Sequence, residues 1–252
     1  MSGRVKRKGR DPVEALPPAA RAAWGRRAEP TKGPRPALTL ARIVDAGVEI
    51  AAAEGIDAVA MSRLARALDV GTMSLYRYVQ GKDDLLALMV DAVFVEAPAP
   101  RGAREGWRAA LARWAAAHLA ALQRHPWTLR IPLSGPPIMP NQVLWFERGM
   151  ACLGGTGLSE ADKLCVLLLV NGFVRNEALL AADLEAARAS RRSAKAPMAG
   201  YGELLGALID ATRFPALSAL VASGVFEGPD VPVAEFKFGL ERILDGVAVL
   251  VR

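Results

Sequence analysis

The chain has 252 residues, of which 52% are hydrophobic and 6% aromatic, a composition typical of an alanine- and leucine-rich helical protein. Its two cysteines, Cys152 and Cys165, provide no disulfide framework, and its longest apolar run, 164–170, falls far short of the ~20 residues that a membrane span requires. These features argue against a disulfide-rich secreted protein and a membrane protein, and predict a soluble cytoplasmic one.

Positive charge is concentrated at the N-terminus. The formal net charge is +6 at pH 7, and residues 1–37 hold ten Lys or Arg against three Asp or Glu, so the rest of the chain is close to neutral. Residues 1–37 mix these charges with Pro and Gly and show no hydrophobic periodicity, which predicts a mostly disordered arm. The arm is either a solvated tail or a segment that strengthens DNA binding by neutralising phosphates, with Lys32 and Arg35 closest to the fold.

The first predicted helix spans 39–54. Apolar residues recur there at helical spacing, Thr39 is a suitable N-cap, and Gly55 is a suitable C-terminal stop. This helix would cover the two short helices that follow and complete a three-helix domain.

Residues 60–82 predict two short helices on either side of a tight turn. Leu64, Ala65 and Leu68 place an apolar stripe on the first helix, and Ser62 is a candidate N-cap for it. In the second helix, Leu75 and Val79 lie four residues apart and face the same way. The turn is Asp69-Val70-Gly71, because Asp and Gly both tolerate positive φ. This is the helix-turn-helix layout, whose second helix lies in the DNA major groove.

The side chains that these helices leave outside the apolar stripe are candidate DNA contacts. Thr72, Met73 and Ser74 open the second helix, the end that approaches base edges. Tyr76 is either a core or helix-flanking aromatic or, the favoured interpretation, aims its hydroxyl at a phosphate. Met73 either meets a thymine methyl or packs. The full predicted set of DNA-binding residues is Ser62, Arg63, Thr72, Met73, Ser74, Tyr76, Arg77, Tyr78 and Lys82.

The sequence GTMSLYRYV followed by GKDDLLALM resembles the DNA-binding end of the tetracycline-repressor family of bacterial regulators, with a match that extends over about residues 38–95. In that family a leucine-tyrosine pair in the recognition helix precedes a lysine that opens the next helix, which implies a phosphate contact for Lys82. Four positions depart from the family pattern. Asp69 replaces a usual glycine, Ala60 and Ser62 replace a frequent threonine and arginine, and Tyr78 replaces a frequent histidine or phenylalanine.

The resemblance implies an all-α protein with three parts. These are a basic arm at 1–37, a helix-turn-helix DNA-binding domain at 38–97, and a larger helical domain at 101–252 for ligand binding and dimerisation. It also implies a transcriptional repressor that binds a palindromic operator in double-stranded DNA as a homodimer. A small molecule in the second domain would lower its affinity for the operator through a population shift.

Helical patterns continue through the second half of the chain, and no segment has a strong strand signal. Acidic residues at 83–84 suit the start of a helix that ends before Pro98, and Ser159 with Asp162 resembles a capping box. The connection at 126–140 is rich in Pro and Gly, and 189–200 is a polar loop. Beyond residue 80, helices are predicted at 82–95, 103–124, 142–153, 160–188, 201–223 with an interruption near 214–215, and 233–251.

Polar residues interrupt the otherwise apolar helix around 164–174. Asn171 and Arg175 either form internal hydrogen bonds or are the polar anchors of a mostly apolar ligand pocket. His118 and His125 have no carboxylate at metal-ligand spacing, so neither a metal nor a cofactor is predicted. The candidate ligand-binding residues are Trp107, Trp114, His118, Trp127, Trp145, Phe146, Asn171 and Arg175.

The last predicted helix has apolar residues at alternating spacings of three and four from Val233 to Leu250, which is a heptad seam. The apolar helix around 164–174 offers a second surface, and two such helices from each chain would form a four-helix interface, as is usual in the family. The predicted interface residues are Leu167, Val170, Phe236, Leu240, Ile243 and Val247.

Two other functional classes are open at this point. The basic arm is compatible with a ligand-independent nucleoid protein. An enzyme with an appended DNA-binding module would need a catalytic cluster in 101–252, where the sequence offers no Gly-rich phosphate loop, no Cys/His cluster and no Ser-His-Asp arrangement.

Overall fold

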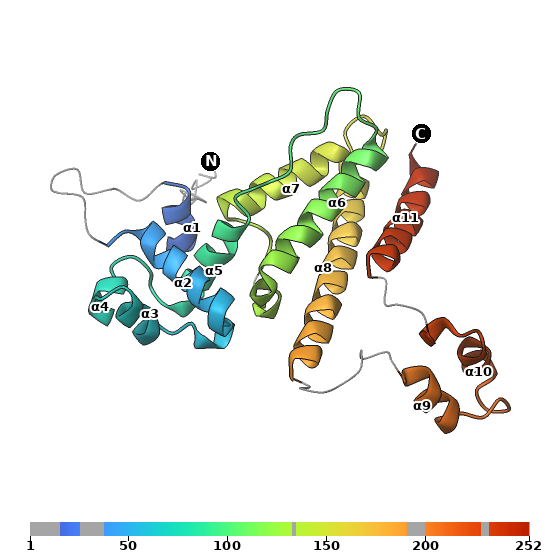
Figure 1. Cartoon of the computed structure of the whole chain (residues 1–252). Coiled ribbons are helices and arrows are strands. Elements are labelled where there is room, and N and C mark those ends of the chain that lie inside the picture. The colour runs from blue at the N-terminus through green and yellow to red at the C-terminus, as the bar shows by residue number, and fades with distance from the viewer. Residues whose placement is uncertain (1–15, 26–37, 133–134, 191–199, 228–231, 252) are drawn as a thin grey trace, which may run out of the picture. The chain divides into compact units, whose positions relative to one another are not determined.

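The computed structural model describes residues 16–25, 38–132, 135–190, 200–227 and 232–251 (Figure 1). These ranges are helical and contain no strand, which confirms the all-α prediction. The α-helices are α1 (Pro18–Ala23), α2 (Leu40–Glu54), α3 (Met61–Ala67), α4 (Thr72–Leu75), α5 (Lys82–Val93), α6 (Trp107–Arg124), α7 (Pro140–Cys152), α8 (Glu160–Ser190), α9 (Tyr201–Leu208), α10 (Pro215–Ala222) and α11 (Pro232–Leu250). Short 3-10 helices lie at Ile56–Ala58, Pro126–Arg130 and Val225–Glu227.

The chain forms two compact units. The N-terminal unit consists of Met1–Ala117 and Arg124–Gly154, and the C-terminal unit consists of His118–Gln123 and Gly155–Arg252. The units therefore do not divide at residues 98–100, where the sequence suggested a boundary. The reason is that α7, which follows that point in the chain, packs against α5 of the DNA-binding region.

Helix α2 has the ends that the sequence predicts. The hydroxyl of Thr39 accepts a hydrogen bond from the backbone N–H of Arg42 (3.2 Å), and Gly55 ends the helix with a φ of 87°. On the buried face, a Cβ at Gly47 would lie 2.8 Å from the sulfur of Met89. A larger residue at this position would require the Met89 side chain to shift.

The turn between α3 and α4 is also as predicted. Asp69 has a φ of 53°, and it is the only non-glycine residue with positive φ in the part of the chain that the structure describes. The predicted cap at Ser62 is wrong: α3 begins at Met61, its N-cap is Ala60 without a side-chain cap, and Ser62 lies exposed in the first turn.

Helix α1 is an ordered exception within the arm that the sequence predicts to be mostly disordered. Ala19 and Ala20 of α1 are buried in the same hydrophobic core as α2 and α5. Beyond the helix, the indole N–H of Trp24 donates to the carbonyl of Ile138 (2.8 Å). Residues 16–25 are thus an ordered part of the N-terminal unit, whereas 1–15 and 26–37 lie outside the described residues.

A buried carboxylate joins α5 to α7. One oxygen of Asp91 accepts hydrogen bonds from the backbone N–H groups of Asn141 and Gln142, both at 3.0 Å, and the Asn141 amide donates to the other oxygen and to the Asp91 carbonyl. Because the first N–H groups of a helix have no partner within the helix, Asp91 serves as an N-cap for α7 supplied from another element. This contact fixes the start of α7 on α5.

In the C-terminal unit, α8 and α11 lie side by side (Figure 1). At the start of α8, the predicted pairing of Ser159 with Asp162 is present: the Asp162 backbone N–H donates to the Ser159 hydroxyl (3.1 Å), and that hydroxyl donates to the Asp162 carboxylate (2.6 Å). The predicted helix at 201–223 is broken into α9, which ends in a cap at Ile209, and α10, which begins at Pro215. The predicted polar loop falls mainly on 191–199, which lie outside the described residues.

Helix α8 has 31 residues and an apolar N-terminal half. By length and composition alone, its segment Glu160–Ala187 is also sufficient to cross a membrane, and 28% of its most apolar window is buried. A helix of a protein core or interface has the same composition, so this criterion alone does not identify a membrane span.

Candidate nucleic-acid interface

Helix α4 is held on the N-terminal unit by its apolar side. Leu75 and Val79 are 0% and 2% exposed, so both face the core as predicted from their spacing. The turn that follows α4 keeps helical geometry, because the N–H groups of Tyr78 and Val79 both donate to the carbonyl of Leu75. The buried side therefore fixes which side chains α4 presents outward.

The opposite side of α4 presents side chains suited to a DNA duplex. Met73 is 77% exposed and Tyr76 is 44% exposed, so both side chains are accessible from solvent. Arg77 and Lys82 are exposed, and Thr72 and Ser74 are half-buried at the helix start. A methionine and a phenol at the surface of a helix that also carries a cation match the mixture of base-edge and phosphate contacts made by recognition helices.

Tyr76 offers a direct test of a phosphate contact. Tyr76→Phe removes only the exposed hydroxyl, so we expect operator binding to weaken by about 1 kcal/mol, the typical net contribution of one hydrogen bond, while dimerisation is retained. Fluorescence anisotropy with a labelled operator duplex measures the change. An unaltered affinity would show that this hydroxyl makes no contact with DNA.

Tyr78 has a different role from the predicted one. Its hydroxyl donates a 2.6 Å hydrogen bond to the carbonyl of Leu38, and its ring packs against the core of the N-terminal unit. The bond ties the start of α2 to the end of the α4 turn, across 40 residues of sequence. The prediction that Tyr78 lies on the exposed side is wrong, because this bond and the core contact hold its side chain half-buried.

Arg63 is engaged within the chain. Its guanidinium forms an ion pair with Glu54 at 2.7 Å, and the two side chains are 38% and 45% exposed. Exposed pairs of this kind contribute only about 0–1 kcal/mol, so a DNA phosphate can replace Glu54 at little cost. Arg63 and Ser62 thus stay candidate contacts from α3.

Three of the predicted ligand-binding aromatics are structural parts of the N-terminal unit. The indole N–H of Trp114 donates to the carbonyl of Trp145 (3.0 Å), and that of Trp145 donates to the carbonyl of Phe94 (2.8 Å). Trp127 is buried in the core of the DNA-binding region, which contradicts its predicted place in a ligand pocket. Trp107 and Phe146 are half-buried in the same unit.

The predicted polar anchors lie in the C-terminal unit. His118 is 9% exposed, and Asn171 and Arg175 are half-buried on α8. Burial lowers the pKa of His118 to about 4, and the positive charge of nearby Arg175 contributes to the same effect. Burial also lowers the pKa of Arg175. At neutral pH the His118 imidazole is therefore uncharged, whereas nearby Arg175 is a partly desolvated cation.

The depressed pKa of His118 predicts acid sensitivity. Between pH 6.5 and about 4 the unfolded chain binds a proton that the folded chain excludes, so stability should fall as the pH decreases through this window, by up to roughly 3 kcal/mol. His118→Gln should flatten the decline, leaving His125 as the remaining histidine. Urea unfolding at pH 7, 6 and 5 measures this, and equal declines in the two proteins would contradict the assignment.

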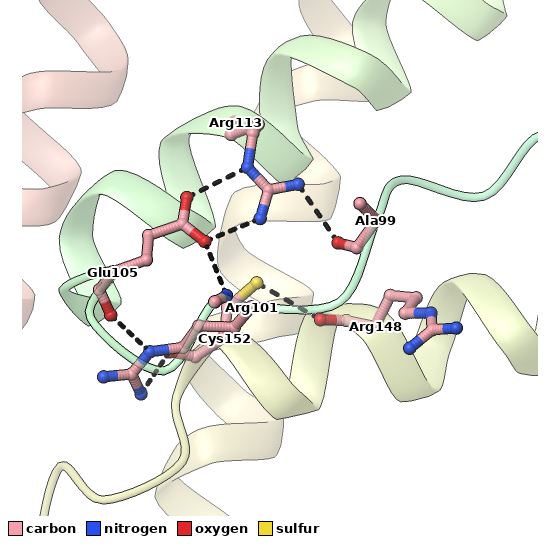
Figure 2. A network of polar contacts seen from close by, with 7 residues as sticks. Ala99, Arg101, Glu105, Arg113, Arg148 and Cys152 are labelled. Carbon is pink, nitrogen blue, oxygen red and sulfur yellow. Dashed lines mark hydrogen bonds and ion pairs between the residues drawn. The ribbon is translucent and has the colours of Figure 1, made fainter.

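Sequence reasoning missed a polar network that fastens the linker before α6 (Figure 2). Arg113 forms a two-pronged ion pair with Glu105, at 2.8 and 2.9 Å, and donates to the carbonyl of Ala99. The bond from Arg113 lowers the pKa of Glu105 to about 2. Arg101 donates to the carbonyls of Glu105, Cys152 and Gly154, so it caps the C-terminal end of α7. No local sequence signal pairs Arg101 with Cys152 and Gly154, which lie 51 and 53 residues further along the chain.

Most of the predicted dimer residues face the inside of their own chain. Four of them, Leu167, Val170, Leu240 and Val247, are 0–5% exposed. Phe236 and Ile243 are half-buried. Phe236 stacks on Phe173 of α8 with ring centroids 5.5 Å apart. The seam that the heptad spacing indicated thus joins α11 to α8 within one chain. The exposed large apolar residues on these helices are Leu164, Leu168, Leu169, Leu180, Phe238, Val249 and Leu250.

Comparison with known families agrees with this geometry. The model for bacterial regulatory proteins of the tetR family matches residues 43–89, and the model for the tetracyclin repressor-like C-terminal domain matches residues 99–251. The HTH-type transcriptional repressor DrrR1 of Streptomyces coeruleorubidus is 38% identical over 239 residues, which cover 90% of this chain and 84% of that protein.

Solved structures give the same result. ActR, a TetR family protein of Streptomyces coelicolor, in complex with (S)-DNPA superposes with a TM-score of 0.72 at 29% identity, covering 85% of this chain and 98% of ActR. The ActR complex with actinorhodin gives a TM-score of 0.70 at 31% identity, covering 85% and 97%. Together with the helix-turn-helix geometry, these matches show that the chain belongs to the tetracycline-repressor family of bacterial transcriptional regulators.

Proposed function

We propose that the protein is a transcriptional repressor that binds a palindromic operator as a homodimer and releases it when a small aromatic ligand enters the C-terminal domain. The observation that carries this proposal is the outward face of α4. Met73, Tyr76 and Arg77 are exposed there while Leu75 and Val79 lock the other side into the core. Its site of action is the cytoplasm, where bacterial DNA lies.

The C-terminal unit supports an aromatic ligand with an acidic group. Arg175 is a partly buried cation next to the uncharged imidazole of His118, and Asn171 lies one helical turn before it. A carboxylate or phenolate would offset the desolvation of Arg175, whereas a neutral imidazole adds a hydrogen-bonding group without a second charge. The actinorhodin complex of ActR, at 31% identity, makes actinorhodin the first compound to test.

The exposed apolar face of α8 supports the dimer. Leu164 and Leu168 lie one turn apart, and Leu169 and Leu180 share a second line further around the helix, with exposures of 38–56%. Exposed apolar side chains gathered on one helix are costly to leave in water, and a second copy of the same helix would cover them. This face replaces Leu167 and Val170 as the proposed α8 contribution to the interface.

Ligand-dependent release is tested with a duplex that the protein itself selects from a random DNA library. Anisotropy titrations should show tight binding to the selected duplex and at least about tenfold weaker binding to a scrambled duplex of equal length, since base contacts add specificity to the phosphate contacts. Addition of actinorhodin should then weaken binding to the selected duplex. Arg175→Leu should bind DNA as the wild type does but lose the response to the compound.

Two results would count against parts of this proposal. Equal affinity for selected and scrambled duplexes would indicate a nucleoid protein that recognises only the DNA backbone. If the protein binds the selected duplex selectively but no aromatic acid weakens that binding, the proposed ligand class is wrong, while the assignment as a repressor stands.

A further inference from the structure

We propose that Arg21 of α1 is a DNA phosphate contact that extends the recognition surface beyond the helix-turn-helix. This inference rests on the proposed function, because it assigns a further residue to the same DNA-binding site. It differs from a general role for the basic arm, since it concerns one residue on an ordered helix and not the segments on either side of it.

The first observation is where Arg21 lies. Arg21 lines a surface hollow of about 320 Å³ together with residues at the end of the α4 turn, and the remaining lining residues are Pro18, Tyr76, Arg77, Tyr78, Val79 and Gln80. The hollow therefore combines an exposed arginine of α1 with Tyr76 and Arg77, two candidate contacts of the recognition element. Two segments that are distant in sequence thus contribute to one face.

The second observation is the charge of this hollow. Its lining residues within the described ranges include two guanidinium groups and no carboxylate, so an anion placed there would meet cations from two elements. The other described hollow of this region, between α2 and α3, has a mixed lining in which Asp45, Glu49 and Glu54 outnumber Arg42 and Arg63. Among the described hollows, the one at Arg21 is thus suited to a phosphodiester.

The third observation is that α1 is held firmly while the Arg21 side chain stays available. Ala19 and Ala20 are buried in the core, and Trp24 is bonded to the carbonyl of Ile138, so both ends of the helix are fixed. Arg21 itself is exposed, and its guanidinium makes no ion pair or hydrogen bond within the described residues. A fixed backbone with an available cation lowers the entropic cost of binding a phosphate.

The experiment measures how the affinity for the selected duplex depends on salt. The slope of log K against log salt concentration becomes shallower by about 0.9 for each phosphate that the protein no longer neutralises, hence by about 1.8 for a dimer with two equivalent arginines. We expect Arg21→Ala to show this shallower salt slope. We also expect it to bind DNA about tenfold more weakly for each protomer at about 0.1 M salt. Arg21→Lys keeps the charge and should retain most of the slope. Because a phosphate contact carries no base information, Arg21→Ala should weaken selected and scrambled duplexes alike.

Arg104→Ala is the matched control. Arg104 is also exposed and lies in the linker before α6, and its replacement removes the same formal charge, so the slope should equal that of the wild type. Alanine favours a helix, so α1 should persist in Arg21→Ala, and an unchanged melting temperature verifies this. Wild-type affinity and slope in Arg21→Ala would overturn the inference. Failure of the wild type to prefer its selected duplex would instead contradict the proposed function.

Discussion

Replacing Leu168 with glutamate should convert the protein to a monomer that no longer binds its operator. Leu168 is 56% exposed on α8, so a single folded chain accommodates the charge in water. In the proposed dimer the same carboxylate would be buried without a partner, which costs several kcal/mol. Since a palindrome is read only by a pair of recognition helices, operator affinity should fall by at least about 100-fold.

Sedimentation velocity and anisotropy measure the two parts of this effect. Val95→Glu is the control, because Val95 is 63% exposed in the linker after α5, and the variant should remain dimeric and active. Leu240→Glu would not discriminate, since Leu240 is 5% exposed and its replacement should unfold the monomer itself. A folded Leu168→Glu dimer of unaltered affinity would remove this face of α8 from the interface.

Asp91→Ala should cause the largest loss of stability among single substitutions between α5 and α7. It leaves the backbone N–H groups of Asn141 and Gln142 without their acceptor at the buried start of α7, which costs roughly 2–4 kcal/mol of unfolding free energy. The same pair of hydrogen bonds links the DNA-binding helices to a helix of the second family domain. We therefore expect the variant also to respond more weakly to ligand.

Asp91→Asn separates charge from hydrogen bonding at this position. Burial raises the pKa of Asp91, and the hydrogen bonds from Gln142 and Asn141 oppose that shift, so the folded protein holds the carboxylate at a desolvation cost. An asparagine oxygen still accepts from the α7 N–H groups, and its neutral amide avoids this cost, but its NH2 group cannot accept the hydrogen bond that the Asn141 amide donates to the second carboxylate oxygen. Chemical unfolding should thus place Asp91→Asn between the wild type and Asp91→Ala. Equal stability of all three would show that Asp91 does not cap α7.

Features encoded by neighbouring residues could be predicted from the sequence. Thr39 caps α2, Asp69 adopts positive φ in the turn, and Ser159 with Asp162 starts α8, because each depends on a side chain and backbone groups a few residues away. The spacing of Leu75 and Val79 correctly gave the buried side of α4 for the same reason.

Features that depend on tertiary packing could not be predicted. Helix α1 is only six residues long and is stabilised by burial of Ala19 and Ala20 in a core formed by later residues. The hydroxyl of Tyr78 bonds to a carbonyl 40 residues away, and Trp127 joins a core formed by residues much earlier in the chain. A single sequence contains no record of these pairings.

The dimer surface illustrates a second limit. Periodicity shows that a helix has an apolar side, but it does not show whether that side meets the same chain or another one. The seam through Leu240 and Val247 is buried against its own chain, whereas Leu168 and Leu169 remain exposed on α8. Exposure in the folded chain was needed to tell these two surfaces apart.

Footprinting on the selected duplex tests most directly whether this protein reads DNA as a pair of recognition helices. Hydroxyl-radical cleavage should show two protected half-sites related by inverted repeat symmetry, with centres about 34–36 Å or a multiple of that distance apart. Thr72→Ala combined with Met73→Ala should abolish the sequence preference while leaving the fold intact, because both side chains lie at the start of α4 outside its fully buried side. Uniform protection along the duplex, or a preference that survives the double substitution, would contradict the account.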